Sequence, residues 1–383
     1  MLFLTRWYPP DSGHFISDIA RAVSLYCQVT VLVVSPKPGN RYFSYNVDHQ
    51  PEAGSAAEQL TVTFNTLSGN WLARLINPIL FIIAQAYGYR FLKRKKRSFD
   101  LIHVHVLTRT AALAFVLNQF CGLPYVISEY WTRYLQEAGS YNGYIRKKTA
   151  SLLTNRAASV ISISRYLQEA MIRQGLKNRN HEIIPLAIDT DRFTPGNLAF
   201  PQNPKRIIHI STFNDKAKNV TGILRAAKKL SSKRSDFELH LIGGSENHVE
   251  QIIQHARLLD PENDLFFFHP PLFGQDLVDE IRKSCFLVMF SRYETFSAVI
   301  QESFSCGIPV IASKAGAVPE NFMAGGGILV EPGDEEALLH AMDEMLDHFQ
   351  EYSSQTLRDH VISHFSFDVI GKVYHQLYQH VLS

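Results

Sequence analysis

The sequence predicts an α/β protein of two doubly wound domains, and three observations support this prediction. Short apolar runs rich in β-branched residues alternate with amphipathic stretches along nearly the whole chain. The runs are apolar on both faces, which is typical of parallel strands covered by helices. The chain has 383 residues, 46% of them hydrophobic and 19% charged. This length suits two domains, and this composition argues against disorder.

Thirteen segments have this strand character. Those of the first half are residues 2–6, 28–34, 60–64, 101–106, 124–128, 159–164 and 182–184. Those of the second half are residues 206–211, 238–242, 265–268, 286–290, 309–312 and 327–330. Between the halves, the stretch 193–205 has three prolines, a glycine and little periodicity, which is typical of a linker. The sequence therefore predicts domains over 1–198 and 199–366, and a last amphipathic helix over 367–383.

The charge of the chain is unevenly distributed. Residues 1–198 hold 22 Lys and Arg against 12 Asp and Glu, a net charge of +10, whereas 199–383 hold 16 against 24, a net charge of −8. The basic half suits an anionic membrane or a phosphorylated acceptor, and no arginine-rich arm or aromatic–basic repeat points to nucleic acid. The four cysteines form no CxxC pair, and the apolar opening 1–8 is too short for a secretory signal. A reducing cytoplasm is the expected compartment.

The most informative segment runs from residue 286 to 332. An apolar run, FLVMF, ends before Ser291 and is followed by a polar turn, a predicted helix from about Phe296 and a glycine stop. A helix that begins where a parallel strand ends points its free N–H groups at the carboxyl edge of the sheet, an arrangement that binds phosphate. We expect Phe296, Ser297 and Ala298 to supply these N–H groups.

Two glutamates frame this helix: Glu294 just before it and Glu302 about two turns in. Carboxylates beside a phosphate site are suited to accept hydrogen bonds from hydroxyl groups, so Glu302 is a candidate for a ribose diol and Glu294 for a transferred sugar. The alternative is that Glu302 is a solvated helix residue and Glu294 a first-turn acid stabilised by the helix dipole.

Loops at other predicted strand ends carry further candidates. Lys216 and Lys218 follow the run 206–211, and either could neutralise a diphosphate. Tight glycine-containing turns are expected at 243–244 and 312–319, where glycine allows close approach of the backbone to a ligand.

In the first half, Gly13 precedes a helix at the end of the opening strand. One glycine does not make a GxGxxG fingerprint, and the chain has no GxxxxGK[ST] sequence. Both observations argue against a nicotinamide dehydrogenase and a P-loop nucleotidase.

Two patterns resemble metal sites. Asp189-Thr190-Asp191 has DxD spacing, but it lies close to the linker, where aspartates commonly cap turns. His103 and His105 lie on one predicted strand, and we expect them to point to opposite faces of the sheet and not to share a metal. No metal site is predicted.

Taken in order, these segments resemble glycosyltransferase family 4, a group of retaining enzymes with the GT-B fold. The resemblance covers nearly the whole chain. In the first half it rests on WYPPDSGHF, DLIHVH, PYVISEYW, SVISISRYL and IIPLAIDTDRFTP. In the second half it rests on KNVTGILRA, HLIGG, SRYETFSAVIQESFSCGIPVIASKAGAVPE and GILVEPGD. The most specific element is the E-x7-E spacing of Glu294 and Glu302, followed by GIPVIAS.

The resemblance implies two facing Rossmann-like domains, with the donor in the C-terminal domain, the acceptor against the N-terminal domain, and the last helix crossing back to the N-terminal domain. It implies that Glu294 contacts the donor sugar and Glu302 the ribose of a UDP- or GDP-linked sugar. Lys218 would stabilise the leaving diphosphate, and Gly13 would approach the donor phosphates. No metal would be required, because lysine and helix N-termini take its electrostatic role.

The chain departs from the family pattern at two positions. Thr212 stands where the family often has an arginine six residues before the lysine, so Lys216 or Arg292 is expected to assist Lys218. Glu129 stands where many members place a histidine near the sugar, and it is a candidate for a sugar-side or acceptor-side role.

The segment from Trp71 to Arg97 ends in KRKKR and has two interpretations. It is either a helix lying on an anionic membrane, which suits a lipid-linked acceptor, or a helix covering the sheet with a solvated basic end. Polar residues and a proline interrupt its apolar run, so a membrane span is not expected.

The expected function is that of a retaining, hexosyltransferase-like enzyme of the cytoplasm, at the inner face of the membrane if that helix binds lipid. It would transfer sugar to a glycan or lipid-linked acceptor in surface polysaccharide or glycoconjugate biosynthesis. The alternatives are a catalytically weak sugar-nucleotide-binding protein and a sugar-nucleotide epimerase on the same GT-B fold.

Overall fold

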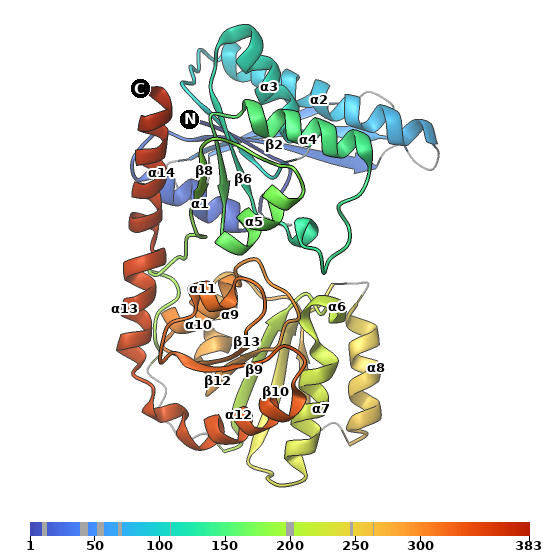
Figure 1. Ribbon diagram of the computed structural model, residues 1–383, viewed down its shortest axis with the longest axis vertical. Coiled ribbons are helices and arrows are strands. Elements are labelled where there is room, and N and C mark those ends of the chain that lie inside the picture. The colour runs from blue at the N-terminus through green and yellow to red at the C-terminus, as the bar shows by residue number, and fades with distance from the viewer. Residues whose placement is uncertain are drawn as a thin grey trace. The chain divides into compact units, whose positions relative to one another are not determined.

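The chain forms two compact α/β units in the computed structural model (Figure 1). Unit 1 comprises Met1–Ala187 together with Phe367–Ser383, and unit 2 comprises Ile188–Ser366. The structure describes residues 1–9, 14–38, 45–51, 57–67, 71–107, 109–196, 203–245, 248–262 and 264–383. Each unit is a sheet covered by helices, as the alternation of apolar runs and amphipathic stretches predicts, so the predicted fold class is confirmed.

The sheet of unit 1 has the strand order β3-β4-β2-β1-β5-β6-β7-β8, and every neighbouring pair is parallel except β3 and β4. Its strands are β1 Leu2–Thr5, β2 Thr30–Pro38, β3 Tyr45–Pro51, β4 Glu58–Thr66, β5 Ile102–His105, β6 Tyr125–Glu129, β7 Ser159–Ser162 and β8 His181–Ile183. Its helices are α1 His14–Ser24, α2 Trp71–Arg94, α3 Thr110–Cys121, η1 Thr132–Tyr134, α4 Tyr144–Arg156, α5 Arg165–Arg173 and α14 Phe367–Leu382. The four strands β1, β5, β6 and β7 are buried along their whole length, because helices cover both of their faces.

The C-terminal helix α14 packs against α1 and completes unit 1 (Figure 1). A Cβ atom at Gly371 would lie 2.2 Å from the carbonyl oxygen of Ala22, so only glycine lets the two helices approach this closely. At the start of the helix, the Tyr26 hydroxyl donates to the Asp368 carboxylate over 2.7 Å. Further along, the Tyr378 hydroxyl lies 2.6 Å from Nδ1 of His103 on β5. The helix is therefore fixed to both a neighbouring helix and the sheet.

The two histidines of β5 lie side by side, and the prediction that they point to opposite faces was wrong. Their ring centroids are 4.1 Å apart, because residues two positions apart on a strand share a face. Both side chains are fully buried. Burial lowers the pKa of His105 to about 3, and burial together with the neighbouring His105 lowers the pKa of His103 well below its usual value. Both rings are therefore neutral at pH 7 and serve packing and hydrogen bonding.

Helix α2 covers the sheet with one face and exposes another. Phe81 packs edge-on against Phe64 of β4, with ring centroids 6.2 Å apart. The opposite face is apolar and exposed, with Trp71, Leu75 and Ile79 each more than half exposed. By length and composition alone, α2 is long and apolar enough to cross a membrane, and it is the one such helix among the described residues. In its most apolar stretch of 18 residues, 33% is buried. The same properties occur in helices that pack on a sheet.

The sheet of unit 2 is entirely parallel, with the order β11-β10-β9-β12-β13-β14. Its strands are β9 Lys205–Ser211, β10 Phe237–Gly243, β11 Phe266–His269, β12 Phe286–Met289, β13 Val310–Ser313 and β14 Gly327–Val330. Its helices are α6 Asp215–Lys218, α7 Val220–Ser231, α8 Val249–Leu259, α9 Gly274–Arg282, α10 Ala298–Ser305, α11 Val318–Asn321, α12 Glu335–His348, η2 Phe349–Glu351 and α13 Ser354–Phe365. This is the strand order of a Rossmann fold, in which the chain changes direction between β9 and β12 and ligands bind at the carboxyl ends of those strands.

Candidate functional site

Two loops of unit 2 meet at the carboxyl ends of β9 and β12, the switch point of the sheet. The loop after β9 leads into the short helix α6, which ends at Lys218, and the loop after β12 carries Glu294. The Lys218 ammonium group forms an ion pair with Oε1 of Glu294. The side chains of Lys218 and Glu294 are 21% and 7% exposed, so little water screens the pair. Two residues that the sequence predicts for the site are thus in direct contact.

Two further hydrogen bonds hold the Glu294 segment. The Ser291 hydroxyl donates to Oε1 of Glu294 over 2.9 Å, and the backbone N–H of Ala317 donates to the Glu294 carbonyl oxygen over 3.1 Å. The second bond joins the glycine-containing loop after β13 to the site. Sequence reasoning missed Ser291, although a serine three residues before a candidate glutamate was a usable signal.

Arg292 ties the two loops together. Its guanidinium group donates to the carbonyl oxygen of Asp215 over 2.6 Å and to Oδ1 of Asn219 over 2.5 Å. Its backbone N–H donates to the carbonyl oxygen of Ala217 over 2.7 Å. These bonds fix helix α6, and therefore Lys218, relative to Glu294. Thr212 is exposed in the loop after β9, and its hydroxyl brings no positive charge to this edge.

Helix α10 begins at Ala298, two residues later than predicted. Ser297 is its N-cap, with φ +69° and ψ 79°, a left-handed conformation that costs a serine about 1–3 kcal/mol and often marks a functional loop. The side chain of Phe296 is buried and packs edge-on against Phe365, with ring centroids 5.6 Å apart. Phe296 therefore precedes the N-cap, and the proposed contact of the Phe296, Ser297 and Ala298 N–H groups with phosphate stays a prediction. Glu302 lies half-buried in the middle of α10.

The turn at the end of β10 belongs to the same sheet edge. Gly243 has φ +119°, and a Cβ atom there would lie 2.1 Å from the carbonyl oxygen of Ser211, the last residue of β9. The N–H of Gly244 donates to that same oxygen over 2.9 Å. The predicted tight turn at 243–244 is thus confirmed, and it keeps the ends of β9 and β10 together.

Glu129 of unit 1 is fully buried at the end of β6. One carboxylate oxygen accepts the backbone N–H groups of Tyr130 (3.0 Å) and Trp131 (3.3 Å). The other accepts the Leu107 N–H (2.8 Å) and the Tyr134 hydroxyl (2.9 Å). Burial raises the pKa of Glu129 against the effect of these bonds. This geometry favours a role in holding the loop after β6 over direct contact with a sugar.

Other candidates from the sequence have different outcomes. Gly13 lies outside the described residues. Asp189 accepts the backbone N–H of Arg192 over 3.2 Å and pairs with its guanidinium group, as a turn-capping aspartate does. Among the described residues, no group of three or more His, Cys, Asp or Glu side chains is placed to hold a metal ion.

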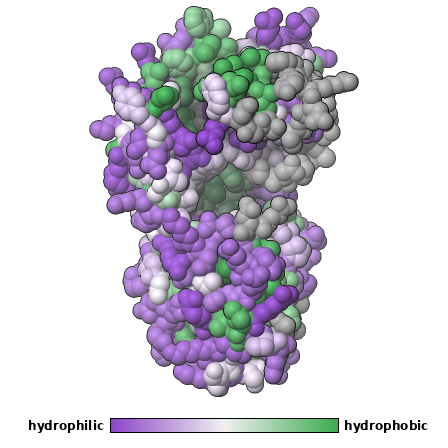
Figure 2. Space-filling model, turned by 90° about the vertical axis from the view of Figure 1, so that its right-hand side faces the viewer, coloured by the Kyte–Doolittle hydropathy of each residue, from purple (hydrophilic) through white to green (hydrophobic). Residues whose placement is uncertain are grey.

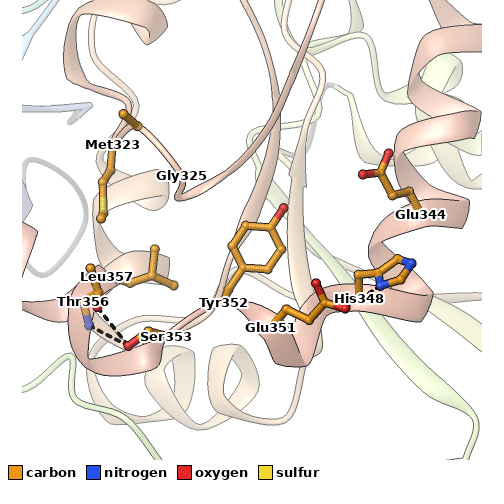
Figure 3. A pocket seen from close by; sticks show the side chains of 10 residues that line it. Met323, Gly325, Glu344, His348, Glu351, Tyr352, Ser353, Thr356 and Leu357 are labelled. Atoms are coloured by element: carbon orange, nitrogen blue, oxygen red, sulfur yellow. Dashed lines mark hydrogen bonds and ion pairs between the residues drawn. The ribbon is translucent and has the colours of Figure 1, made fainter.

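A cavity of about 600 Å³ lies elsewhere on unit 2, near α12, η2 and the start of α13 (Figure 3). The loop Met323–Gly325 that lines it precedes β14, so it lies at the amino end of that strand. Its polar groups include His348, which pairs with Glu351 over 2.6 Å, and Glu344. None of the site residues predicted from the sequence lines this cavity, so it is separate from the edge that holds Lys218 and Glu294.

Comparison with known families accounts for both halves of the chain. Residues 15–187 match the glycosyl transferase 4-like domain, and residues 191–356 match glycosyl transferases group 1. Among curated relatives, the chain is 22% identical to D-inositol 3-phosphate glycosyltransferase of Corynebacterium jeikeium, over 91% of this chain and 83% of that one. It is 25% identical to N-acetyl-alpha-D-glucosaminyl L-malate synthase of Bacillus anthracis, over 75% and 76%.

Solved structures give the same result for the fold. Sucrose-phosphate synthase of Thermosynechococcus elongatus aligns with a TM-score of 0.76 at 18% identity, over 99% of this chain and 98% of that one. Anabaena HepE, in complex with UDP and glucose, aligns with a TM-score of 0.72 at 17% identity, over 99% of both chains. Because the two family matches follow one another along a chain with the GT-B fold, this chain belongs to glycosyltransferase family 4 and is a glycosyltransferase.

Proposed function

We propose that the protein is a retaining glycosyltransferase that takes a sugar from a UDP- or GDP-linked donor bound at the carboxyl edge of the unit 2 sheet. The observation that carries this proposal is the poorly solvated Lys218–Glu294 ion pair at the switch point between β9 and β12. Such an edge suits a nucleotide, with the diphosphate near a cation and a helix N-terminus. Two similar structures hold related ligands: HepE holds UDP and glucose, and an Escherichia coli trehalose-6-phosphate protein holds UDP-2-fluoro glucose.

In the proposed reaction, an acceptor hydroxyl attacks the anomeric carbon on the face from which the nucleotide leaves. The bond from the acceptor oxygen to that carbon forms as the bond to the phosphate oxygen breaks, and the hydroxyl proton passes to the leaving phosphate. Lys218 stabilises the negative charge that develops on the diphosphate, which removes the need for a metal. Glu294 and Glu302 accept hydrogen bonds from the sugar and the ribose. Arg292 acts by holding α6 in place.

We propose further that the acceptor is bound by unit 1 and is lipid-linked, and that the enzyme acts at the cytoplasmic face of a membrane in glycoconjugate or surface polysaccharide synthesis. The net charge of +10 over residues 1–198 and the exposed apolar face of α2 support this part of the proposal.

A thermal-shift experiment tests the donor site. The melting temperature is measured with UDP, GDP and ADP and their sugar conjugates, for the native chain, Glu302→Ala and the control Glu344→Ala. A nucleotide at about 100 times its Kd should add about 2.7 kcal/mol to the free energy of unfolding. We expect one nucleotide to stabilise the native chain and Glu344→Ala equally, and Glu302→Ala much less. Loss of the shift in Glu344→Ala alone would assign the nucleotide to the cavity of Figure 3 instead.

The same experiment separates the two alternative functions. If a nucleotide stabilises the chain but no sugar is transferred to any lipid-linked or glycan acceptor, the chain is a binding protein. This outcome is worth testing because Thr212 stands where the family often has an arginine. Conversion of the donor sugar with no acceptor present would identify an epimerase.

Vesicle binding tests the membrane contact of α2. Leu75 and Ile79 are 59% and 56% exposed, and the basic residues 93–97 follow on the same helix and its end. Inserting two such side chains into lipid contributes roughly 3 kcal/mol, so Leu75→Glu/Ile79→Glu should weaken cosedimentation with phosphatidylglycerol-containing vesicles roughly 100-fold. The control is Leu258→Glu, which changes an apolar residue that is 81% exposed on unit 2. Equal vesicle binding by the native chain and the double variant would contradict the membrane contact.

A further inference from the structure

Unit 1 has a cavity of about 600 Å³ at its own switch point. The chain changes direction between the neighbouring strands β1 and β5, and ligands of open α/β sheets bind outside the carboxyl ends of such strands. Arg6 and Trp7 directly follow β1, and Leu107 and Arg109 follow β5; all four line the cavity. Helices α2 and α4 complete its walls.

Four arginines line this cavity: Arg6, Arg109, Arg133 and Arg146. Among the residues that the structure describes, no aspartate or glutamate lines the cavity, and none of the four arginines forms an ion pair with a carboxylate. Burial and the neighbouring charges of Arg6 and Arg146 lower the pKa of Arg109. Guanidinium groups stay charged at neutral pH, so the four cations repel one another, and the charge of the buried Glu129 acts on Arg133 and offsets part of this repulsion.

Two tryptophans hold two of these arginines in place. The Arg133 guanidinium carbon lies 3.5 Å from the Trp131 ring centroid, and that of Arg6 lies 5.5 Å from the Trp7 ring centroid. The Trp7 and Trp131 rings contact each other edge-on, with centroids 4.7 Å apart. The loop that carries Trp131 and Arg133 is fixed by the buried carboxylate of Glu129. Two of the four arginines, Arg6 and Arg133, are therefore positioned before any ligand arrives.

The rest of the wall is apolar and continues onto the surface. Phe81 and Ile82 of α2 and Ile145 and Leu153 of α4 line the cavity, and Ile145 is also 78% exposed. Hydrophobic surface gathers over unit 1 in the upper half of Figure 2. The apolar wall of the cavity therefore reaches the protein surface at Ile145.

We propose that this cavity binds the phosphate or diphosphate group of a lipid, with the apolar chain leaving between α2 and α4. Arginine pairs with phosphate through two parallel hydrogen bonds, and several arginines suit the multiple oxygens of such a group. This inference rests on the proposed function, of which it names the acceptor class: a sugar carried on a lipid phosphate. The apolar walls distinguish this ligand from a soluble phosphorylated sugar.

Tryptophan fluorescence tests the proposal, because Trp7 and Trp131 line the cavity and the chain has only three tryptophans. In a Trp71→Phe background, the signal is titrated with farnesyl phosphate, farnesol and inorganic phosphate. We expect farnesyl phosphate to saturate the signal, and each of the other two to bind at least about 30-fold more weakly, since each provides half of the interaction.

The variant Arg109→Ala/Arg146→Ala is expected to weaken farnesyl phosphate binding by about 30-fold or more. The control Arg156→Ala removes an exposed arginine of the same helix α4 that does not line the cavity, and it should bind like the native chain. Farnesol binding as tightly as farnesyl phosphate would overturn the proposal in favour of an apolar cavity. Equal binding of inorganic phosphate would overturn it in favour of a site for free anions.

The experiments distinguish failure of the lipid-phosphate site in unit 1 from failure of the donor site in unit 2. If no nucleotide shifts the melting temperature but farnesyl phosphate binds as expected, the donor assignment is wrong and the lipid-phosphate site stands. If the double variant binds farnesyl phosphate as tightly as the native chain while UDP or GDP still stabilises both proteins, the lipid-phosphate site alone is wrong.

Discussion

Lys218→Met is expected to reduce donor turnover by about 10²- to 10³-fold, the usual effect of removing one group that stabilises charge in a transition state. Methionine fills nearly the same volume as lysine but carries no charge. The leaving diphosphate would then face Glu294 with no cation between them, because Lys218 forms the ion pair with this glutamate. The measurement is release of nucleoside diphosphate from the donor that stabilises the native chain.

Two further variants separate the chemistry from other effects of the substitution. Lys233→Met changes an exposed lysine that follows α7, at the opposite edge of the sheet, and should keep nearly full turnover. Lys218→Arg keeps the charge but changes its shape, and it should retain most binding of nucleoside diphosphate with reduced turnover. Binding of the nucleoside monophosphate should be unaffected by Lys218→Met, since it lacks the second phosphate. A fall in turnover as large in Lys233→Met as in Lys218→Met would contradict the assignment.

Glu129→Ala is expected to lower the free energy of unfolding by about 4 kcal/mol, because it leaves several buried donors without an acceptor. The donors are the N–H groups of Leu107, Tyr130 and Trp131 and the hydroxyl of Tyr134. Glu129→Gln should cost about half as much, since the amide keeps one acceptor oxygen but turns its NH₂ towards other donors. Urea unfolding followed by tryptophan fluorescence measures this effect in unit 1, which contains all three tryptophans.

The matched control is Glu137→Ala. Glu137 is exposed and accepts one hydrogen bond, from the Tyr166 hydroxyl over 2.7 Å, so its removal should cost less than about 1 kcal/mol. If Glu129→Ala instead unfolds at the native urea concentration but no longer transfers sugar, the carboxylate contacts a substrate directly. That result would restore the role suggested by its place in the family pattern.

The fold could be predicted from the sequence to a large extent. All thirteen predicted strand segments overlap strands of the structure, because parallel strands buried on both faces leave a strong apolar signal. Strand β3 was missed, since YNVDHQP is polar and ends in proline, as an edge strand permits. The start of α10 was misplaced because nothing in the sequence showed that Ser297 adopts a left-handed conformation and that Phe296 turns into the core.

The candidate site was predictable in its residues but less so in its contacts. The spacing of Glu294 and Glu302 located the helix, and lysines after an apolar run located α6. Pairing of Lys218 with Glu294 depends on β9 and β12 being neighbours, although 76 residues separate the two side chains along the chain. The arginine cavity of unit 1 was equally hidden, because its residues come from five separate segments that only the fold brings together.

The C-terminal helix α14 belongs to unit 1, although unit 2 separates it from the rest of that unit in the sequence. The polypeptide therefore encodes unit 2 as one continuous fragment, Ile188–Ser366, but unit 1 as two fragments. A protein of residues 1–187 alone would expose the surface of α1 around Ala22, which α14 covers. It would also leave His103 without its hydrogen bond to the Tyr378 hydroxyl. A soluble form of unit 1 for crystallisation or NMR thus requires a gene in which Ala187 is joined through a short linker to Phe367, or co-expression of the helix as a separate peptide.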